Sequence, residues 1–334
     1  MAYGLKAFRK AWLGKETTTA PGTEVAADIY WRGTVEGMKD DRAMDVIEED
    51  IGMTLPSGRI ISPRVGATWE VAETPATYQQ LPYIFSASVE GTVTGAADSA
   101  GANKIYQFDR AACTAAGAVA TYTIEVGDNV RVDKMTYGFV EEWTLSGAAG
   151  EAVMLTATWR GRETTDGEFT STAPTLPAVE EILFTTGKLY VDATTIGTTQ
   201  KTGSWLGFSV TYAGGNVPLY TGDGNATAYF STLKPGVPEI TGELTFEHDA
   251  TGTAEITAAR NKTLRYVRML FAGSSTGTAG ALYSHYTLKM DLAIKYTEVP
   301  VIDAEDTDDV VTLPFTAVYN TSPQFTVVNK AAAL

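Results

Sequence analysis

A regular alternation of apolar and polar residues runs from Tyr286 to Tyr296. Every second residue of this stretch is apolar, and between these residues lie Thr287, Lys289, Asp291, Ala293 and Lys295. A period of two held over this length predicts a β-strand with one face on a core and the other toward solvent or a neighbouring molecule. At about 3.3 Å per residue the strand would extend roughly 36 Å, so it requires comparable strands beside it.

Similar stretches recur along the chain and predict a mainly β protein. The other predicted strands cover residues 29–35, 63–71, 122–126, 135–145, 153–160, 183–191, 206–212, 240–246, 264–271 and 310–319. Within residues 135–145, the alternation predicts a shared face for Met135, Tyr137, Phe139, Trp143 and Leu145.

Two helices are predicted among these strands. Pro82 suits a first helical turn, so the first helix is predicted to begin near Leu81, and the second covers residues 254–263. Near the N-terminus, Leu5, Phe8 and Trp12 have the spacing of a short amphipathic helix, with a strand as the alternative.

Two long polar loops, residues 36–59 and 213–234, begin at corresponding positions in the two halves of the chain. The first is strongly acidic, but it lacks the glycine spacing of a calcium loop. We therefore interpret both loops as solvated segments that contact other molecules. The candidate contact residues in them are Asp40, Asp41, Asp45, Glu48, Glu49, Asp50, Asn216, Tyr220 and Asp223.

The order of elements predicts a duplicated organisation. Each half runs strand, long loop, strand, helix, loop, strand, turn, strand, although few residues are identical between the halves. The predicted parts are an N-terminal arm (1–24), a first copy (25–163), a linker rich in Thr, Ser and Pro (164–179), a second copy (180–320) and a C-terminal arm (321–334).

Composition narrows the possible functions. The chain has 334 residues and a net charge of −15, which makes it a poor binder of phosphate backbones. With one cysteine, Cys113, the chain cannot form an internal disulfide, and we interpret this residue as a small buried or half-buried thiol. The sequence has no apolar run of membrane-spanning length, so we expect a soluble protein made in a reducing compartment.

The sequence contains short matches to catalytic and metal-binding motifs, but none of them has the surrounding elements that its chemistry requires. Residues 273–277 match G-x-S-x-G, but a nucleophile elbow needs a following helix, and a strand is predicted there. Only His248 and His285 could serve as its base, and with one cysteine they do not form a zinc set. We therefore expect no enzyme activity, no cofactor and no metal.

Several short stretches, taken in order, carry a resemblance to a known family. They are Leu13-Gly14-Lys15-Glu16-Thr17, the Gly22-Thr23 turn, Trp31-Arg32-Gly33, Leu81-Pro82-Tyr83, Arg265-Tyr266-Val267-Arg268, Lys295-Tyr296-Thr297-Glu298 and Ala317-Val318-Tyr319-Asn320. With them the chain resembles, over nearly its whole length, the tail tube (major tail) proteins of long, flexible-tailed bacteriophages.

This resemblance implies a β-barrel or sandwich with a flanking helix, present twice, in rings that stack into a hollow tube. A subunit with two copies implies a trimeric ring with pseudo-sixfold symmetry, and a hexamer of simpler subunits stays open. The implied partners are the tape measure protein, the tail terminator and tip proteins, and transiently passing DNA. The implied location is the virion tail, after synthesis in the host bacterial cytoplasm. The polar residues Lys289, Asp291 and Lys295 are further candidates for contact between subunits.

Two alternatives follow from the same strand pattern. One is another β-rich virion component, such as a decoration or baseplate protein. The other is a carbohydrate-binding β-sandwich, which would need an exposed aromatic platform; most of the tryptophans lie in or beside predicted strands, where core packing explains them.

Overall fold

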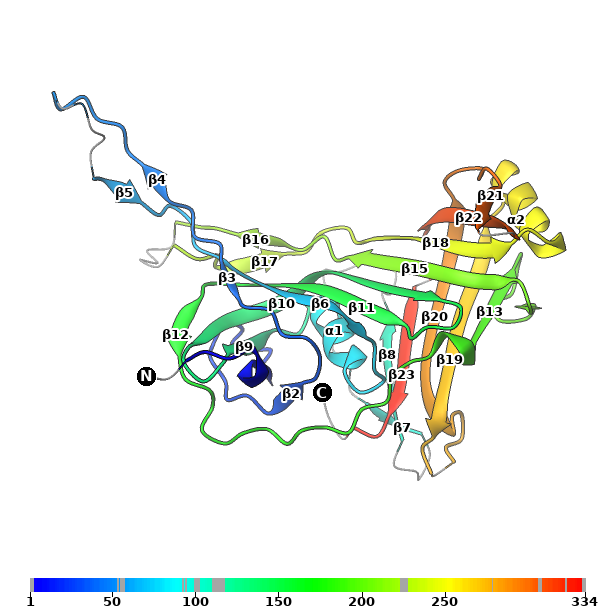
Figure 1. Ribbon diagram of the computed structural model, residues 1–334, viewed down its shortest axis with the longest axis horizontal. Helices are drawn as coiled ribbons and strands as arrows, with labels where there is room; N and C mark the ends of the chain where they lie inside the picture. The colour runs from blue at the N-terminus through cyan, green and yellow to red at the C-terminus, as the bar shows by residue number, and fades with distance from the viewer. Residues whose placement is uncertain are drawn as a thin grey trace.

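The structure is a computed structural model that describes residues 3–52, 54, 58–91, 93, 95–98, 103–109, 118–222, 228–277, 279–305, 308–321 and 323–331. It is mainly β, with antiparallel strands and two α-helices in the described part, as the sequence predicts (Figure 1). Asp223 and Cys113 lie outside the described residues.

The first half contains a 3-10 turn, η1, and one helix. Its elements are η1 (Lys6–Phe8), β1 (Lys10–Lys15), β2 (Ile29–Trp31), β3 (Lys39–Asp40), β4 (Asp45–Val46), β5 (Ile60–Ile61), β6 (Ala67–Pro75), α1 (Leu81–Ser88), β7 (Ala96–Ala97), β8 (Lys104–Asp109), β9 (Tyr122–Gly127), β10 (Val132–Ala148), β11 (Met154–Gly161) and β12 (Thr165–Gly167).

The second half begins after an extended segment that follows β12. Its elements are η2 (Phe184–Thr186), β13 (Gly187–Asp192), β14 (Gln200–Lys201), β15 (Trp205–Ala213), β16 (Val217–Leu219), β17 (Thr232–Lys234), β18 (Glu239–Glu247), α2 (Ala250–Arg260), β19 (Arg265–Ser275), β20 (His285–Tyr296), β21 (Asp303–Glu305), β22 (Asp308–Ala317) and β23 (Gln324–Asn329).

The strand pairings occur in the same order in both halves. In the first half β1 lies between β2 and β9, β9 pairs with β10, β10 with β11, and β11 with β6. In the second half β13 lies between β14 and β19, β19 pairs with β20, β20 with β22, and β22 with β18. A helix follows β6 and β18, and the early part of β10 and of β20 pairs with β12 and β23 respectively.

Two ladders join the halves. Residues 142–148 of β10 pair with residues 207–213 of β15, and β23 pairs with β8. At this junction Trp143 and Tyr212 stack with ring centroids 5.5 Å apart, and Phe325 contacts both rings. Phe85 of α1 packs against Trp143 and Phe325, so one core runs through both halves.

Both predicted terminal arms contain core strands. Residues 10–15 form β1, with Ala11 and Leu13 fully buried, and only the 3-10 turn η1 is helical. The helix predicted around Trp12 is therefore wrong and the alternative of a strand is confirmed, because pairing with β2 and β9 on both edges decides the local structure. The predicted C-terminal arm contains β23, which lies between β20 and β8.

The long strand β10 does not present a single apolar face. Met135 and Trp143 belong to the main core, whereas Tyr137 and Phe139 face a second cluster with Phe230. The ladder shifts register after Met135, where Tyr137 has a φ of 58°. An extra residue in one strand turns the following side chains to the opposite face, which simple alternation does not anticipate.

The predicted strand from Tyr286 is confirmed as β20, and its apolar face is buried. Its polar face is more covered than predicted. Asp291 is buried beneath Arg268, which donates two hydrogen bonds of 2.7 and 2.8 Å to it, and Lys289 donates to Gln324 at 2.8 Å. Lys295 is the charged residue of this face that stays exposed.

Leu292 and Lys295 give a matched test of this strand. We expect Leu292→Ala to lower the free energy of unfolding by about 2–5 kcal/mol, because the leucine is 1% exposed and its loss leaves a cavity. Lys295→Ala should change it by about 0.5 kcal/mol or less. Thermal unfolding of both variants checks this, and equal destabilisation would contradict the two-faced strand.

Candidate assembly interface

The hairpin formed by β16 and β17, here called the docked hairpin (residues 217–234), lies against the first half of the same chain (Figure 1). Phe230 is fully buried, with its ring 5.1 Å from Tyr137 and 6.4 Å from Phe139. Arg162 donates hydrogen bonds of 3.1 and 2.7 Å to the carbonyl oxygens of Phe230 and Ser231. The docking thus combines an aromatic cluster with a charged donor.

The surface that receives this hairpin is organised by one buried carboxylate. Glu16 accepts hydrogen bonds from the backbone N–H groups of Gly22 and Tyr137, at 2.6 and 2.8 Å, and from the hydroxyls of Thr121 and Thr123. These donors satisfy the carboxylate without a salt bridge being needed, and they fix the bulge that turns Tyr137 toward Phe230.

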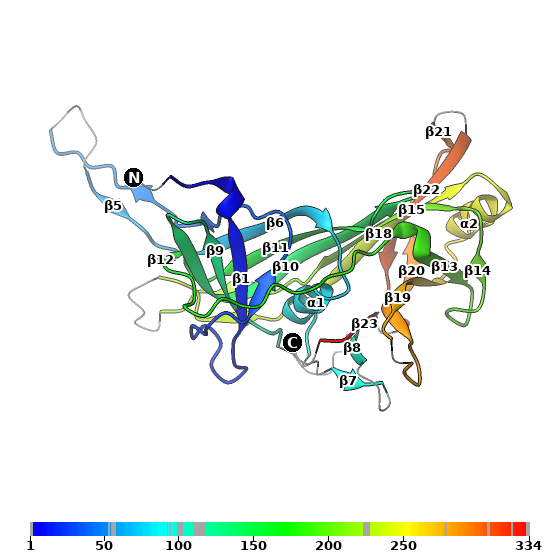
Figure 2. The same cartoon turned by 60° about the horizontal axis from the view of Figure 1, so that its bottom comes forward.

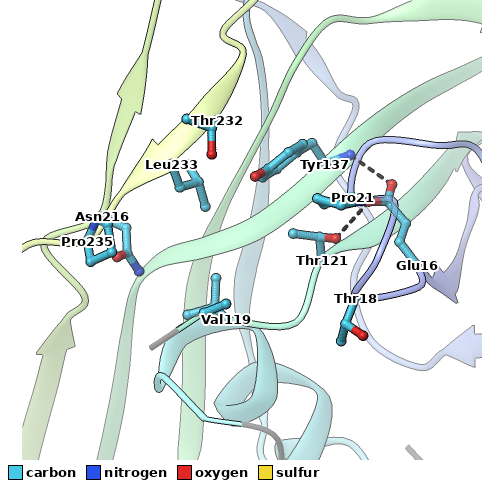
Figure 3. A pocket seen from close by; sticks show the side chains of 11 residues that line it. Glu16, Thr18, Pro21, Val119, Thr121, Tyr137, Asn216, Thr232, Leu233 and Pro235 are labelled. Carbon is cyan, nitrogen blue, oxygen red and sulfur yellow. Dashed lines mark hydrogen bonds between the residues drawn. The ribbon is translucent and has the colours of Figure 1, made fainter. Parts of the chain in front are cut away.

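A small cavity of about 130 Å³ lies between the docked hairpin and this surface (Figure 3). Glu16, Tyr137, Val119 and Leu233 line it, and the side-chain amide nitrogen of Asn216 is buried there without a hydrogen-bond partner in the described structure. Water molecules fit a polar space of this size, so we interpret the cavity as part of the packing between the two halves.

The second half contains a turn of the same design. Asp192 is the last residue of β13, as Glu16 directly follows β1, and it accepts backbone hydrogen bonds from Thr198 and Thr199 at 2.9 and 2.8 Å. Gly22 and Gly197 occupy the two turns with similar positive φ values of 83° and 81°. Burial alone would raise the pKa of Asp192, but these hydrogen bonds outweigh it and lower that pKa.

The other hairpin, here called the projecting hairpin (residues 39–61, with β3, β4 and β5), extends away from the body of the molecule (Figures 1 and 2). Several of its predicted contact residues are engaged within the hairpin region. Asp41 pairs with Lys39 at 2.8 Å and accepts from Thr68, Asp40 lies 3.6 Å from Arg42, and Glu49 pairs with Arg59.

The projecting hairpin instead exposes apolar side chains. Val46 pairs with Ile60 across the two strands, and each is more than half exposed. Met44, Ile51 and Ile61 are exposed as well, and so are Asp45, Glu48 and Asp50. Paired apolar residues on an extended hairpin are typical of a segment that packs on a partner.

Residues 213–234 were predicted to contact other molecules, and this stays a prediction, although part of the segment is engaged within the subunit. Asn216 is buried, and the Tyr220 hydroxyl donates to the carbonyl oxygen of Val65 at 3.3 Å within the same chain. Lys289 and Asp291 are likewise engaged inside the subunit, as described above. Of the three predicted contact residues on β20, Lys295 is the exposed one.

The sequence interpretation missed a second exposed apolar group. Val299, Val301 and Ile302 follow β20, and Tyr319 follows β22, all at least 46% exposed. The signal was present, because three apolar residues stand close together at 299–302 without a polar residue in alternation. At the corresponding place the first half pairs with β15 of the second half, whereas in the described chain no strand pairs with the second half there.

Other kinds of site have little support in the described part of the chain. No group of three or more histidine, cysteine, aspartate or glutamate side chains there could hold a metal ion. Within the same residues, neither helix has the length and apolar character needed to cross a bilayer.

Comparison with known proteins adds no assignment. The chain matches no protein-family model, and no curated protein matches it. The functional argument therefore depends on the sequence and the geometry described above.

Arg162 provides a test of the docked hairpin. In Arg162→Ala we expect amide hydrogen exchange in residues 217–222 and 228–234 to become about tenfold faster or more, because hydrogen bonds from a charged donor contribute about 1.5–3 kcal/mol. Arg131→Ala, at an exposed arginine paired with Asp133, is the control. Unchanged exchange in the hairpin would show that Arg162 does not hold it.

Asp192 provides a test that depends on pH. A lowered folded-state pKa stabilises the fold above the unfolded value of about 3.9, and this stabilisation is lost as pH falls through the folded pKa. We expect Asp192→Asn to melt at a lower temperature than the unmodified protein at neutral pH, with the difference shrinking below about pH 4. Asp166→Asn, at an exposed carboxylate, is the control. A difference that stays constant with pH would contradict this role.

Proposed function

We propose that this chain is a tail tube protein of a long, flexible-tailed bacteriophage. Its subunits would form rings that stack into a hollow tube through which phage DNA passes. The observation that carries the proposal is the repeated order of strand pairings, together with the ladder by which β10 of the first half joins β15 of the second.

The repeated pairings support a subunit built from two copies of one fold. Pairs of elements follow the same order, including the 3-10 turns before β1 and β13 and the hairpins between β3 and β6 and between β15 and β18. In a ring, two such copies would stand side by side as neighbours. The β10–β15 ladder would then be one of the contacts repeated around the ring.

A head-to-tail contact of this kind closes into a ring when its rotation closes. With two copies in each chain, three chains would give a ring with pseudo-sixfold symmetry. Pairing between subunits would also cover strand edges that otherwise invite aggregation. A second, axial contact would stack the rings into a tube.

The charge of the chain suits a conduit for DNA. DNA carries about one negative charge per 1.7 Å, and a protein with a net charge of −15 would not retain it through phosphate contacts. The proposed partners are further copies of this chain, the tape measure protein, and the tail terminator and tip proteins. The proposed location is the virion tail, after synthesis in the host cytoplasm.

The alternative of a carbohydrate-binding sandwich has less support. Trp12, Trp31, Trp69, Trp143 and Trp159 are buried, and Trp205 is half-buried among Phe184, Phe208 and Phe271. The tryptophans therefore offer no exposed stacking platform. A decoration or baseplate protein remains the second candidate, because its strands could pair between subunits in the same way.

Negative-stain imaging of the purified protein tests the proposal. We expect hollow rings or tubes, because a head-to-tail contact between subunits can close into a ring, and native mass spectrometry of single rings should give three chains. A protein that stays monomeric over the whole accessible concentration range would contradict the proposal. Sugar binding by an isolated monomer would favour the carbohydrate alternative.

A further inference from the structure

The junction between the two halves contains two parts that act together. One part is the ladder between residues 142–148 and residues 207–213. The other is the docked hairpin, which continues from the same strand and packs over Tyr137 and Arg162. A strand edge and a hairpin of the second half are thus received by a strand edge and a surface of the first half.

The receiving edge has a counterpart in the second half. Glu142 pairs with Thr158 of β11, and Lys295 pairs with Thr316 of β22. Thr158 and Thr316 each pair in turn with the strand that precedes a helix, β6 or β18. Lys295 therefore occupies the position of Glu142, and residues 295–301 correspond to the receiving residues 142–148.

The donating edge has a counterpart in the first half. Lys39 pairs with Thr68 of β6, and Ala213 pairs with Glu239 of β18. Thr68 lies two residues before Glu70, the β6 partner of Thr158, and Glu239 lies two residues before Thr241, the β18 partner of Thr316. Lys39 therefore occupies the position of Ala213, residues 33–39 correspond to 207–213, and the projecting hairpin corresponds to the docked hairpin.

Both counterparts are unpaired in the described subunit. The ladder between β19 and β20 ends at Ile294, and Val299 and Val301 beyond it are exposed, the second of them 87%. Of residues 33–39 only Lys39 belongs to a described ladder, the one with β6, and the Glu36 carbonyl oxygen accepts a hydrogen bond from the Trp69 indole. Within the described residues, one chain thus has a donating edge in its first half and a receiving edge in its second that are not joined to another strand.

We propose that the projecting hairpin of one chain docks on the second half of a neighbouring copy of the same chain. Residues 33–41 add as a strand to residues 295–301, and the exposed apolar side chains of β4 and β5 pack over Tyr319. This inference rests on the proposed function, since it specifies the contact that would close the ring.

The position of the docked hairpin supports the same arrangement. In the internal junction the hairpin passes over Arg162, just after β11. Tyr319 and Asn320 stand just after β22, the counterpart of β11, and Tyr319 is 71% exposed beside Tyr266 and Asn320, which are hydrogen-bonded. An aromatic surface is therefore present where the apolar residues Val46 and Ile60 of a neighbour would arrive.

Charge sets the register of the new ladder. A residue-for-residue transfer would place Lys39 opposite Lys295, and like charges directly opposite each other disfavour a ladder. A displacement by two residues keeps every side chain on its face and places Asp41 opposite Lys295. In that register Gly37 lies opposite Val299, and Val35 lies opposite Val301.

A cysteine pair tests this contact in the full-length chain. Gly37→Cys and Val299→Cys are combined with Cys113→Ser, because a Cβ at Gly37 meets no atom within 4 Å and Val299 is exposed. We expect a short bismaleimide to link chains into covalent dimers and larger species, and its reach tolerates either register. Gly37→Cys with Glu151→Cys, an exposed residue in the β10–β11 turn, is the control pair and should not link.

A second pair of variants tests the apolar contact. Val46→Asp with Ile60→Asp should raise the concentration needed for assembly about tenfold or more, because unpaired charges would enter an apolar interface. The melting temperature of the subunit should stay unchanged, since both side chains are exposed. The control is Val237→Asp, just after the docked hairpin, at a side chain that is 89% exposed. This substitution should leave assembly unchanged.

Imaging of the same samples separates this inference from the proposed function. Rings or tubes with a Gly37–Val299 link support both. Rings or tubes without that link, or with normal assembly of the hairpin variant, overturn the hairpin contact and leave the tube function standing. Linked chains that never form rings or tubes support the contact and contradict the tube function.

Discussion

The rest of the structure depends on one strand ladder, between the second part of β10 and β15. Three aromatic side chains cover this ladder. Trp143 stacks on Tyr212 with an interplanar angle of 6°, and Phe325 lies edge-on to both rings. Backbone pairing fixes the register of the two halves, and the aromatic contacts bury the seam. Without this ladder each half would expose an edge and part of its core.

Buried carboxylates shape the surfaces around that ladder. The Glu16 carboxylate accepts hydrogen bonds from neutral donors. The Glu125 carboxylate lies 3.2 Å from the Lys134 ammonium, and the Glu255 carboxylate accepts hydrogen bonds from Arg265 and Tyr296. A buried carboxylate without partners would cost considerable free energy. Each of these three carboxylates therefore keeps its hydrogen-bond donors in fixed positions. Carboxylates that in sequence suggest an acidic surface therefore act in part as internal anchors of turns and bulges.

The sequence predicted most strands and both helices, because alternation and Pro82 are local signals. It favoured a helix over the strand alternative at β1 and placed β23 in an arm, because these short apolar runs become strands only through partners distant in sequence. It did not anticipate that Asp41 and Tyr220, both predicted contact residues, make hydrogen bonds within their own subunit. Whether a polar residue meets solvent, a neighbour or its own chain depends on tertiary packing, and alternation alone does not encode that.

The pairing of β23 with β8 has a consequence for how the chain folds. These strands lie more than two hundred residues apart in sequence, and β23 also completes the edge of β20. Until β23 is synthesised, the edge of β8 has no partner from the second half, and contacts of such long range form slowly. During synthesis that edge is an opportunity for mispairing between nascent chains on one polysome, and the pace of folding would be set by the arrival of β23.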